Sequence, residues 1–467
     1  MKQVSRLMIA AATLAAFTTV AAADDGVYAG FPVTVKGYQG DKKSSVSYGG
    51  QAARNVLHDS LKKLAGSGAS AEEMLRYYEG KDAGREILAP VSKDGFPIRQ
   101  TGVDELSGDK NIAGKTYKGA ILGWPNAMTG PELVKFWIGK AADGNAVDLR
   151  SGYDYAQLIS KFVMGAMNYN QVVDGYLDEN LGADKKPNDQ PYSEGAAYTG
   201  KEHSWDEAFG YFGAPAHALS LSASDAYDIA KQKPEALAKA DHDGDGKVDL
   251  YREMVFGPAY YAAGFDRSTA GKENETRYFH GIVQAFLDGR KLLTAAKGEK
   301  LTDAQRAELR AHAATIGKLW QTVLAEAVFK YAGETYEDLA KLEIIMDANG
   351  DTDEAFADYV KHWGELKGFS LALQTGRENL GETATRLNRM IGYGPWLLNA
   401  SQVVDIDSGG NYVKGQASSM GEYMRHLLQV QQLMVDEFGV KARSHDNLGD
   451  FTAISDKLGS GASAEND

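Results

Sequence analysis

Residues 302–333, TDAQRAELRAHAATIGKLWQTVLAEAVFKYAG, carry the longest helical pattern in this 467-residue chain and decide its fold class. Thr302 and Asp303 are typical of a helix N-terminus, and Gly333 is typical of a helix end. The same kind of pattern recurs in eleven other segments: 51–66, 70–80, 130–142, 153–181, 203–212, 222–232, 248–265, 276–298, 335–343, 353–374 and 418–439.

Strand-like patterns are scarce. Only residues 27–38, VYAGFPVTVKGY, alternate as a strand does. We therefore predict an all-α protein of long antiparallel helices, arranged as two related helical bundles that share an interface. A short extended arm is expected at the N-terminus.

The first residues have the form of a secretory signal. Lys2 and Arg6 are followed by an apolar run, LMIAAATLAAF, and Ala21 and Ala23 fit the small-x-small cleavage rule. The run is too short for a transmembrane helix, and no later stretch is long and apolar enough to be one. We expect a signal peptide over residues 1–23 and an exported mature chain that is soluble, either in the periplasm or associated with the cell surface.

The composition excludes several kinds of site and partner. The chain has no Cys, which excludes disulfides, thiolate metal sites and a Cys nucleophile. Its formal charge is −14, and loss of Lys2 and Arg6 with the signal changes this to −16. Such a charge argues against nucleic acid and anionic lipid as partners, and it is compatible with cation binding.

No Pro-rich linker divides the chain, so we predict one continuous helical domain over residues 24–445. Two related halves are expected within it, at about 49–240 and 254–445, joined by an acidic loop at 241–253. The Gly- and Ser-containing end, residues 446–467, is predicted to be a flexible tail.

A short internal repeat supports the two halves. Residues 201–215, KEHSWDEAFGYFGAP, and residues 361–370, KHWGELKGFS, share the pattern W-x-E-x-x-G-aromatic. Trp205 and Phe209 fall on a helix face suited to the core, and the glycines Gly210 and Gly368 would let another helix or a ligand come close.

Each copy of the repeat also places a His and an acid on one helix face. His203 and Glu207 are four residues apart, and His362 and Glu365 are three apart. Two interpretations remain open: each pair is a buried polar tie between helices, or the residues bind a transition metal such as iron or zinc. The candidate ligands of this second metal site are His203, Asp206, Glu207, His362 and Glu365.

The most specific chemical pattern is DHDGDGKVDLYRE, residues 241–253, which resembles an EF-hand loop. Alternating short carboxylates aim several hard oxygens at one point, and Gly246 permits the sharp turn between them. Position twelve is Arg252 instead of the usual Glu, and the nearest acid, Glu253, comes one residue late. We predict a structural calcium site whose ligands are Asp241, Asp243, Asp245, the backbone carbonyl of Lys247, Asp249 and Glu253.

A second acidic turn, DANGDTDE, begins at Asp347, but Thr352 stands where a Gly should be. We expect a loop between two helices, with Asp351 or Thr352 capping the helix that carries His362.

Four stretches, YAQLISKFVMGAMNY (155–169), EHSWDEAFGYFG (202–213), AFLDGRK (285–291) and KHWGELKGFSLALQ (361–374), carry a family resemblance. Over about residues 45–440 the chain resembles an uncharacterised bacterial family of exported helical proteins, often encoded beside imelysin-type iron-regulated proteins. The resemblance implies an all-helical exported protein connected with the acquisition of iron or another metal, with envelope metal-uptake proteins as partners. It transfers no catalytic residue.

Imelysin-type proteins are similar in having a duplicated helical body and a G-x-H-x-x-E motif. Here His362 and Glu365 fit H-x-x-E, whereas Val360 replaces the Gly and His203 is followed by Asp206 at that spacing. The favoured function is a calcium-stabilised accessory or binding protein for metal acquisition. The alternatives are a metal-dependent hydrolase of the imelysin-like peptidase type, for which the chain has no H-E-x-x-H, or a structural, partner-binding scaffold.

Overall fold

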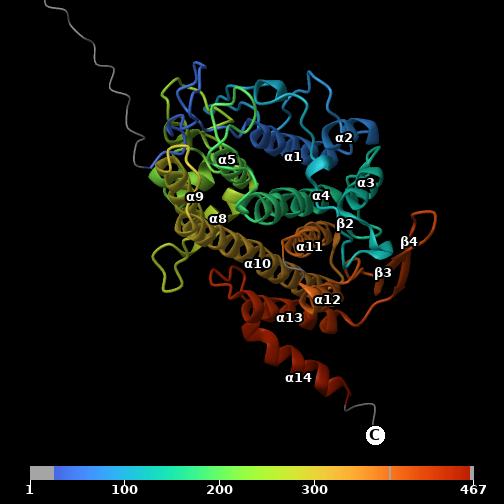
Figure 1. Cartoon of the computed structure of the whole chain (residues 1–467). Helices are drawn as coiled ribbons and strands as arrows, with labels where there is room; N and C mark the ends of the chain where they lie inside the picture. Colours follow the sequence, from blue (N-terminus) through green and yellow to red (C-terminus); the bar gives the residue numbers. More distant parts are fainter. Residues whose placement is uncertain (1–25, 378–379, 463–467) are drawn as a thin grey trace, which may run out of the picture.

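The computed structural model describes residues 26–377 and 380–462 (Figure 1). Over this part of the chain the protein is predominantly helical, with two small antiparallel hairpins, which confirms the all-α prediction. The predicted signal peptide, residues 1–23, lies outside the described residues. No helix in the described ranges is long and apolar enough to cross a membrane.

The N-terminal half of the chain supplies seven α-helices among the described residues. They are α1 (Gly49–Ser67), α2 (Ala71–Tyr78), α3 (Gly130–Ala141), α4 (Tyr155–Val163), α5 (Gly200–Phe212), α6 (Ala223–Ala230) and α7 (Leu237–Ala240). Helix α4 continues through two π-helical segments, Met164–Tyr169 and Gln171–Tyr176.

The rest of the described chain supplies seven more. They are α8 (Gly257–Thr269), α9 (Tyr278–Ala295), α10 (Asp303–Asp347), α11 (Asp353–Leu373), α12 (Gly381–Ile391), α13 (Met420–Phe438) and α14 (Phe451–Ala462). The hairpins pair β1 (Val147–Asp148) with β2 (Tyr153–Asp154), and β3 (Ser401–Ile406) with β4 (Tyr412–Gln416).

Local side chains fix several helix ends as the sequence predicts. The hydroxyl of Thr302 accepts from the Gln305 N–H at 3.2 Å, and Gln305 accepts from the Thr302 N–H at 2.9 Å. This reciprocal cap starts α10. Helix α5 ends at Gly213, which has a φ of 75°, a left-handed conformation that favours glycine.

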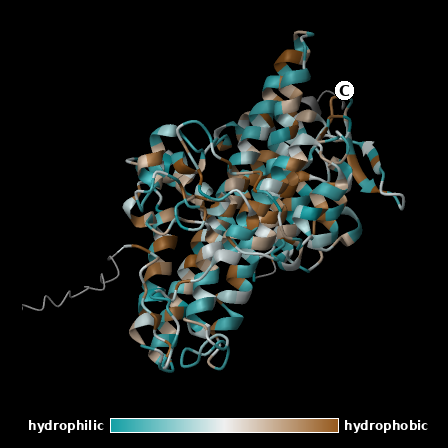
Figure 2. Ribbon diagram, turned by 90° about the horizontal axis from the view of Figure 1, so that it is seen from above, coloured by the Kyte–Doolittle hydropathy of each residue, from teal (hydrophilic) through white to brown (hydrophobic). Residues whose placement is uncertain are grey.

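Helix α10 organises the body. It packs against α9, α11 and α13, and α11 packs in turn against α4, which packs against α1 (Figure 1). Hydrophilic and hydrophobic residues share the same helices, as amphipathic packing requires (Figure 2). Buried residues from both expected halves form one contiguous hydrophobic cluster.

The predicted core residues of the repeat are buried. Trp205 and Phe209 are fully inaccessible, and the Trp205 indole donates to the Phe286 carbonyl at 2.8 Å. The N-terminal arm adds to this core, because the ring of Tyr28 stacks on Phe209 with centroids 3.8 Å apart. The arm is therefore an integral part of the α5 environment.

Some boundaries differ from the prediction. The expected helix over 248–265 is wrong in its first half: Asp249–Arg252 form a turn, and α8 begins only at Gly257, with Pro258 in its first turn. The segments 302–333 and 335–343, predicted as two helices, form the single helix α10. Gly333, expected to end the first of them, lies inside α10, where a Cβ would meet the His445 carbonyl.

Within the segment expected to be a flexible tail, α14 spans Phe451–Ala462, and Phe451 and Ile454 pack against the core.

Candidate functional site

The acidic loop at 241–253 lies between α7 and α8 and is folded on its own carboxylates. Asp241 accepts from the N–H groups of Gly244 and Gly246, both at 2.9 Å. Asp243 accepts from the Asp245 N–H at 3.2 Å, and Asp245 accepts from the Lys247 N–H at 2.9 Å. These bonds turn the chain tightly around the carboxylates, as a cation-binding loop requires.

Glu253 closes the loop from its end. Its side chain is buried and accepts from the N–H groups of His242 at 2.9 Å, Asp243 at 3.0 Å and Asp249 at 2.8 Å. Burial raises the pKa of Glu253 in spite of these bonds. The acid that the sequence places one residue late therefore reaches the centre of the loop.

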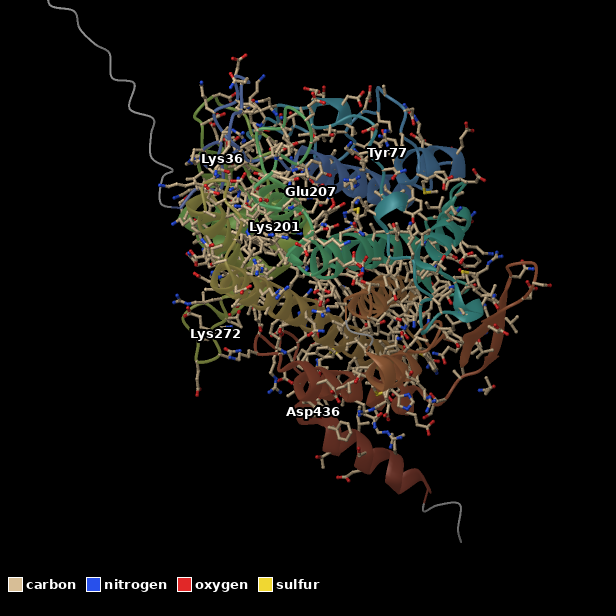
Figure 3. All side chains as sticks on the ribbon, in the orientation of Figure 1. Lys36, Tyr77, Lys201, Glu207, Lys272 and Asp436 are labelled. Carbon is tan, nitrogen blue, oxygen red and sulfur yellow. The ribbon has the colours of Figure 1, made fainter. Side chains whose placement is uncertain are left out.

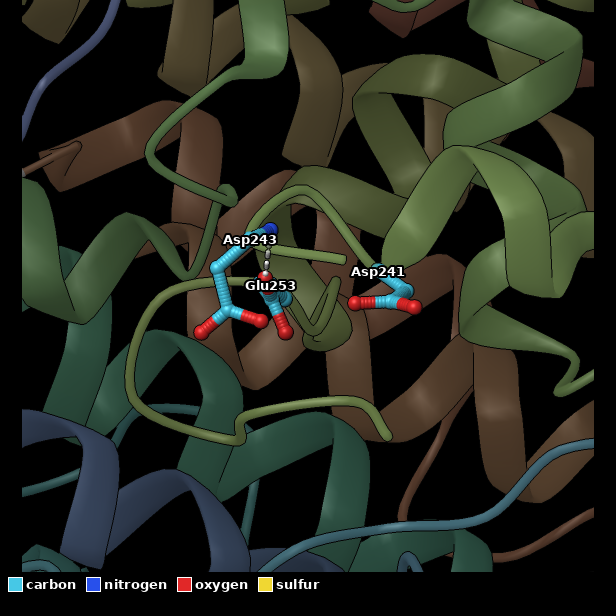
Figure 4. A group of neighbouring side chains, drawn as sticks. All are labelled: Asp241, Asp243 and Glu253. Carbon is cyan, nitrogen blue, oxygen red and sulfur yellow. Dashed lines mark hydrogen bonds between the residues drawn. The ribbon is translucent and has the colours of Figure 1, made fainter. Parts of the chain in front are cut away.

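Three carboxylates converge there. One oxygen each from Asp241, Asp243 and Glu253 lies within 4.8 Å of the others (Figure 4). Over residues 26–377 and 380–462 this is the one group of three or more His, Asp or Glu residues that meets this distance. The carboxylates could hold a hard cation, for which oxygen ligands are suited.

Arg99 is the loop's partner that sequence reasoning missed. Its Nη2 atom donates to Asp243 at 2.7 Å and to Asp245 at 2.6 Å, and its Nη1 atom donates to Asp249 at 3.4 Å. The hydrogen bond from Arg99 lowers the pKa of Asp243. No spacing in the sequence joins residue 99 to residue 243, so no motif could have indicated this contact.

The backbone also ties these two segments together. The Arg99 N–H donates to the Val248 carbonyl at 3.0 Å, and the Val248 N–H donates to the Pro97 carbonyl at 2.9 Å. Gln100 adds a bond from its amide to Asp249 at 2.7 Å. The loop therefore clamps the segment 97–100 onto the helical body.

The first candidate pair, His203 and Glu207, lies on α5 among aromatic rings. Their side chains are 3.8 Å apart, and the ring of His203 stacks on Tyr198 with centroids 4.4 Å apart. Glu207, labelled in Figure 3, accepts from the Gln51 amide at 2.8 Å. Burial lowers the pKa of His203, which favours a neutral ring.

Asp206 belongs to a different contact network. Its carboxylate accepts from Arg290 and from the Tyr28 hydroxyl, both at 2.9 Å, and from the Ser47 N–H at 3.1 Å. Burial, only partly offset by Arg290, raises the pKa of Asp206 to about 6. These bonds direct the carboxylate toward Arg290 and the arm.

The second pair lies on α11. His362 is 2.7 Å from an oxygen of Asp338 on α10, and Glu365 is 3.1 Å from the ammonium of Lys161 on α4. Burial is the largest single effect and opposes a charge on His362, but the hydrogen bond to Asp338 and the negative charges of Asp338, Glu334 and Glu365 together raise its pKa. His362 and Glu365 line a cavity to which His203, Asp206 and Glu207 do not contribute, so the two pairs occupy separate environments.

This cavity has a volume of about 820 Å³ and is lined by residues of α1, α4, α6, α8, α10 and α11. Lys62 of α1, Lys161 of α4, Tyr261 of α8, Lys330 of α10 and Glu365 of α11 are among its lining residues. The sequence pointed to Glu365 and His362 but not to the lysines, because each lysine lies on a separate helix and belongs to no local motif.

Comparison with known families adds one match. Residues 138–233 match a domain of unknown function, DUF4856, and the match extends from the end of α3 to just beyond α6. It includes Lys161 and the repeat copy on α5, and is consistent with an uncharacterised family. No curated protein and no solved structure matches the chain.

Proposed function

We propose that this protein is an exported, non-enzymatic binding protein, stabilised by calcium at the loop 241–253, that serves the acquisition of iron or another metal. The convergence of Asp241, Asp243 and Glu253 carries the calcium part of the proposal. The signal-like N-terminus and the family resemblance support export and the connection with metals.

Electrostatics favour a divalent cation in the loop. Five carboxylates occupy residues 241–253, and a single guanidinium, that of Arg99, bonds three of them. Asp241 and Glu253 have no bond to Arg99, and their oxygens face the Asp243 carboxylate. A hard divalent ion at this point would reduce the repulsion among these carboxylates that the charge of Arg99 does not offset.

The role of the ion is structural in this proposal. The loop holds segment 97–100 through Arg99 and Gln100, and it fixes the turn from α7 into α8. Calcium would therefore stabilise the packing of the N-terminal half against α8, and an extracellular calcium level would suffice for a weak site.

Titration calorimetry of the mature chain, residues 24–467, with Ca²⁺ tests the calcium part. We expect one calcium site, lost in Asp241→Asn, and unchanged in the control Asp351→Asn, whose carboxylate only accepts from the Asp353 N–H. Absence of calcium binding in the wild-type protein would refute it. Parallel titrations with iron and zinc test the metal-acquisition part. If the protein binds neither metal, only a partner-binding role is left.

A further inference from the structure

The cavity between α1, α4, α6, α8, α10 and α11 has a positive wall in an acidic protein. Six lysines and four acidic residues line it, whereas the whole chain has a formal charge of −14. A local excess of ammonium groups inside a concave surface attracts anions and strengthens their binding.

Most of the acids in the wall already have partners. Glu365 pairs with Lys161 at 3.1 Å, and Glu334 pairs with Lys330 at 3.1 Å. Asp154 caps α4 by accepting from the Gln157 N–H at 3.0 Å, and Asp59 contacts His58 at 3.0 Å. Two of the four acids are thus paired with lysines of the same wall, and Asp154 and Asp59 bond to other groups.

Four of the six lysines of the wall, Lys62 among them, form no ion pair with a carboxylate among the described residues. The like charge of Lys161 is the largest influence on Lys62 and lowers its pKa, with burial acting in the same direction and Glu365 and Asp59 acting in the opposite one. Two like charges facing one cavity are stabilised when an anion lies between them.

Aromatic hydroxyls complete the wall. The ammonium of Lys161 lies 5.5 Å from the ring centroid of Tyr261, and the Tyr261 hydroxyl is 3.0 Å from that of Tyr331. Rings and hydroxyls of this kind suit the carbon skeleton of an organic ligand, and a volume of about 820 Å³ is that of a small-molecule site.

We propose that this cavity binds a small organic anion, whose carboxylate or phosphate group lies between the ammonium groups of Lys62 and Lys161. The inference goes beyond the calcium-stabilised binding protein proposed above and uses none of the residues of the acidic loop. The calcium site and the anion site can therefore be tested independently of each other.

Titration calorimetry of the mature chain with succinate and with inorganic phosphate separates the two possible anionic groups, and glucose serves as an uncharged control. We expect binding of at least one anion and none of glucose. Lys62→Gln should weaken that binding about tenfold or more, since it removes a charge-assisted hydrogen bond. Lys341→Gln, an exposed lysine on α10 outside the cavity, should leave it unchanged.

Chemical footprinting of the wild-type protein gives a second measurement that does not depend on a variant's folding. The bound anion should slow the acetylation of Lys62 and leave that of Lys341 unaffected. The proposal is overturned if neither anion binds, if Lys62→Gln binds as tightly as the wild type, or if the anion fails to protect Lys62.

Discussion

The guanidinium of Arg290 lies 2.9 Å from the carboxylate of Asp206, and neither side chain has any solvent exposure. Arg290 also contacts Glu202 at 2.9 Å and donates to the Ser45 hydroxyl at 2.5 Å. One buried cation thus joins α9 to two acids of α5 and to the N-terminal arm.

Arg290→Met should lower the free energy of unfolding by about 3–5 kcal/mol, because it leaves the buried carboxylates of Glu202 and Asp206 without their cation. Urea denaturation of the mature chain measures the loss. The control is Arg277→Met, whose side chain is 82% exposed and whose ion pair with Glu275 lies on the surface. Equal stability of the two variants would contradict this account of the network.

Removal of calcium should lower the melting temperature. A ligand that binds only the folded state stabilises it by about 2.7 kcal/mol when its concentration is 100 times Kd. We expect EDTA to destabilise the wild-type protein and Asp351→Asn equally, and to have no effect on Asp241→Asn. An unchanged melting temperature of the wild type after chelation would argue against a structural ion at 241–253.

Anion binding in the cavity should weaken as pH rises through neutrality. The like charge of Lys161, then burial, lowers the pKa of Lys62 to about 7, while Glu365 and Asp59 act in the opposite direction. Lys62 is charged below this pKa, so succinate should bind more tightly at pH about 6 than at pH about 8.5.

The matched comparison for this prediction is Lys62→Gln, measured by calorimetry at the same pH values. His362 also lines the cavity and has a raised pKa, so the variant should keep a smaller pH dependence. The same pH profile in the variant and the wild type would show that Lys62 is not the titrating group.

Lys367 gives a pH dependence of stability. Burial lowers its pKa to about 7, and its ammonium nitrogen donates to Asn388 at 3.1 Å and to the Gly392 carbonyl at 2.7 Å. An unfolded lysine has a pKa of about 10.4. Between pH about 7 and about 10.4 the unfolded state therefore binds more protons than the folded state, and the free energy of unfolding should rise with pH.

Lys367→Met removes this titration. The stability of the wild type relative to Lys367→Met, measured by urea denaturation, should therefore increase between pH about 7 and about 9. A constant difference over that range would contradict a depressed pKa at Lys367.

The glycines of the repeat should not tolerate a side chain. A Cβ at Gly368 would lie 2.6 Å from the Cβ of Lys161, where α11 meets α4. Gly368→Ala should thus destabilise the protein by about 1–3 kcal/mol, as overpacking does. The control is Gly139→Ala on α3, where a Cβ meets nothing within 4 Å, and this variant should be neutral or slightly stabilised. Thermal melts of both variants measure the difference.

Helix periodicity and capping residues made most of the helical body predictable. Thr302 caps the helix that the sequence assigned to it, and α2, capped by Ser70, lies within the predicted segment 70–80. The prediction of a helix over 248–265 was wrong in its first half, because the acidic loop 241–253 turns the chain there. The hairpin β3–β4 was not predicted, although Val403 and Val413 flank a Gly409–Gly410 turn, which is a strand signal.

The candidate site was only partly predictable. The spacing of Asp241, Asp243 and Asp245 identified the acidic loop, because its residues are neighbours in sequence. Arg99 and Lys62 could not be found this way, since Arg99 bonds to Asp243 and Lys62 lines one cavity with Lys161, and both partners are far away in the chain. Long-range packing, which local patterns do not encode, brings these charges together.

Helix α10 is a single rod of 45 residues, roughly 68 Å long at 1.5 Å per residue. Because α9, α11 and α13 all lie against it, the rod joins these three helices through one common element. Pulling on either end of the rod would therefore load all three neighbouring helices together.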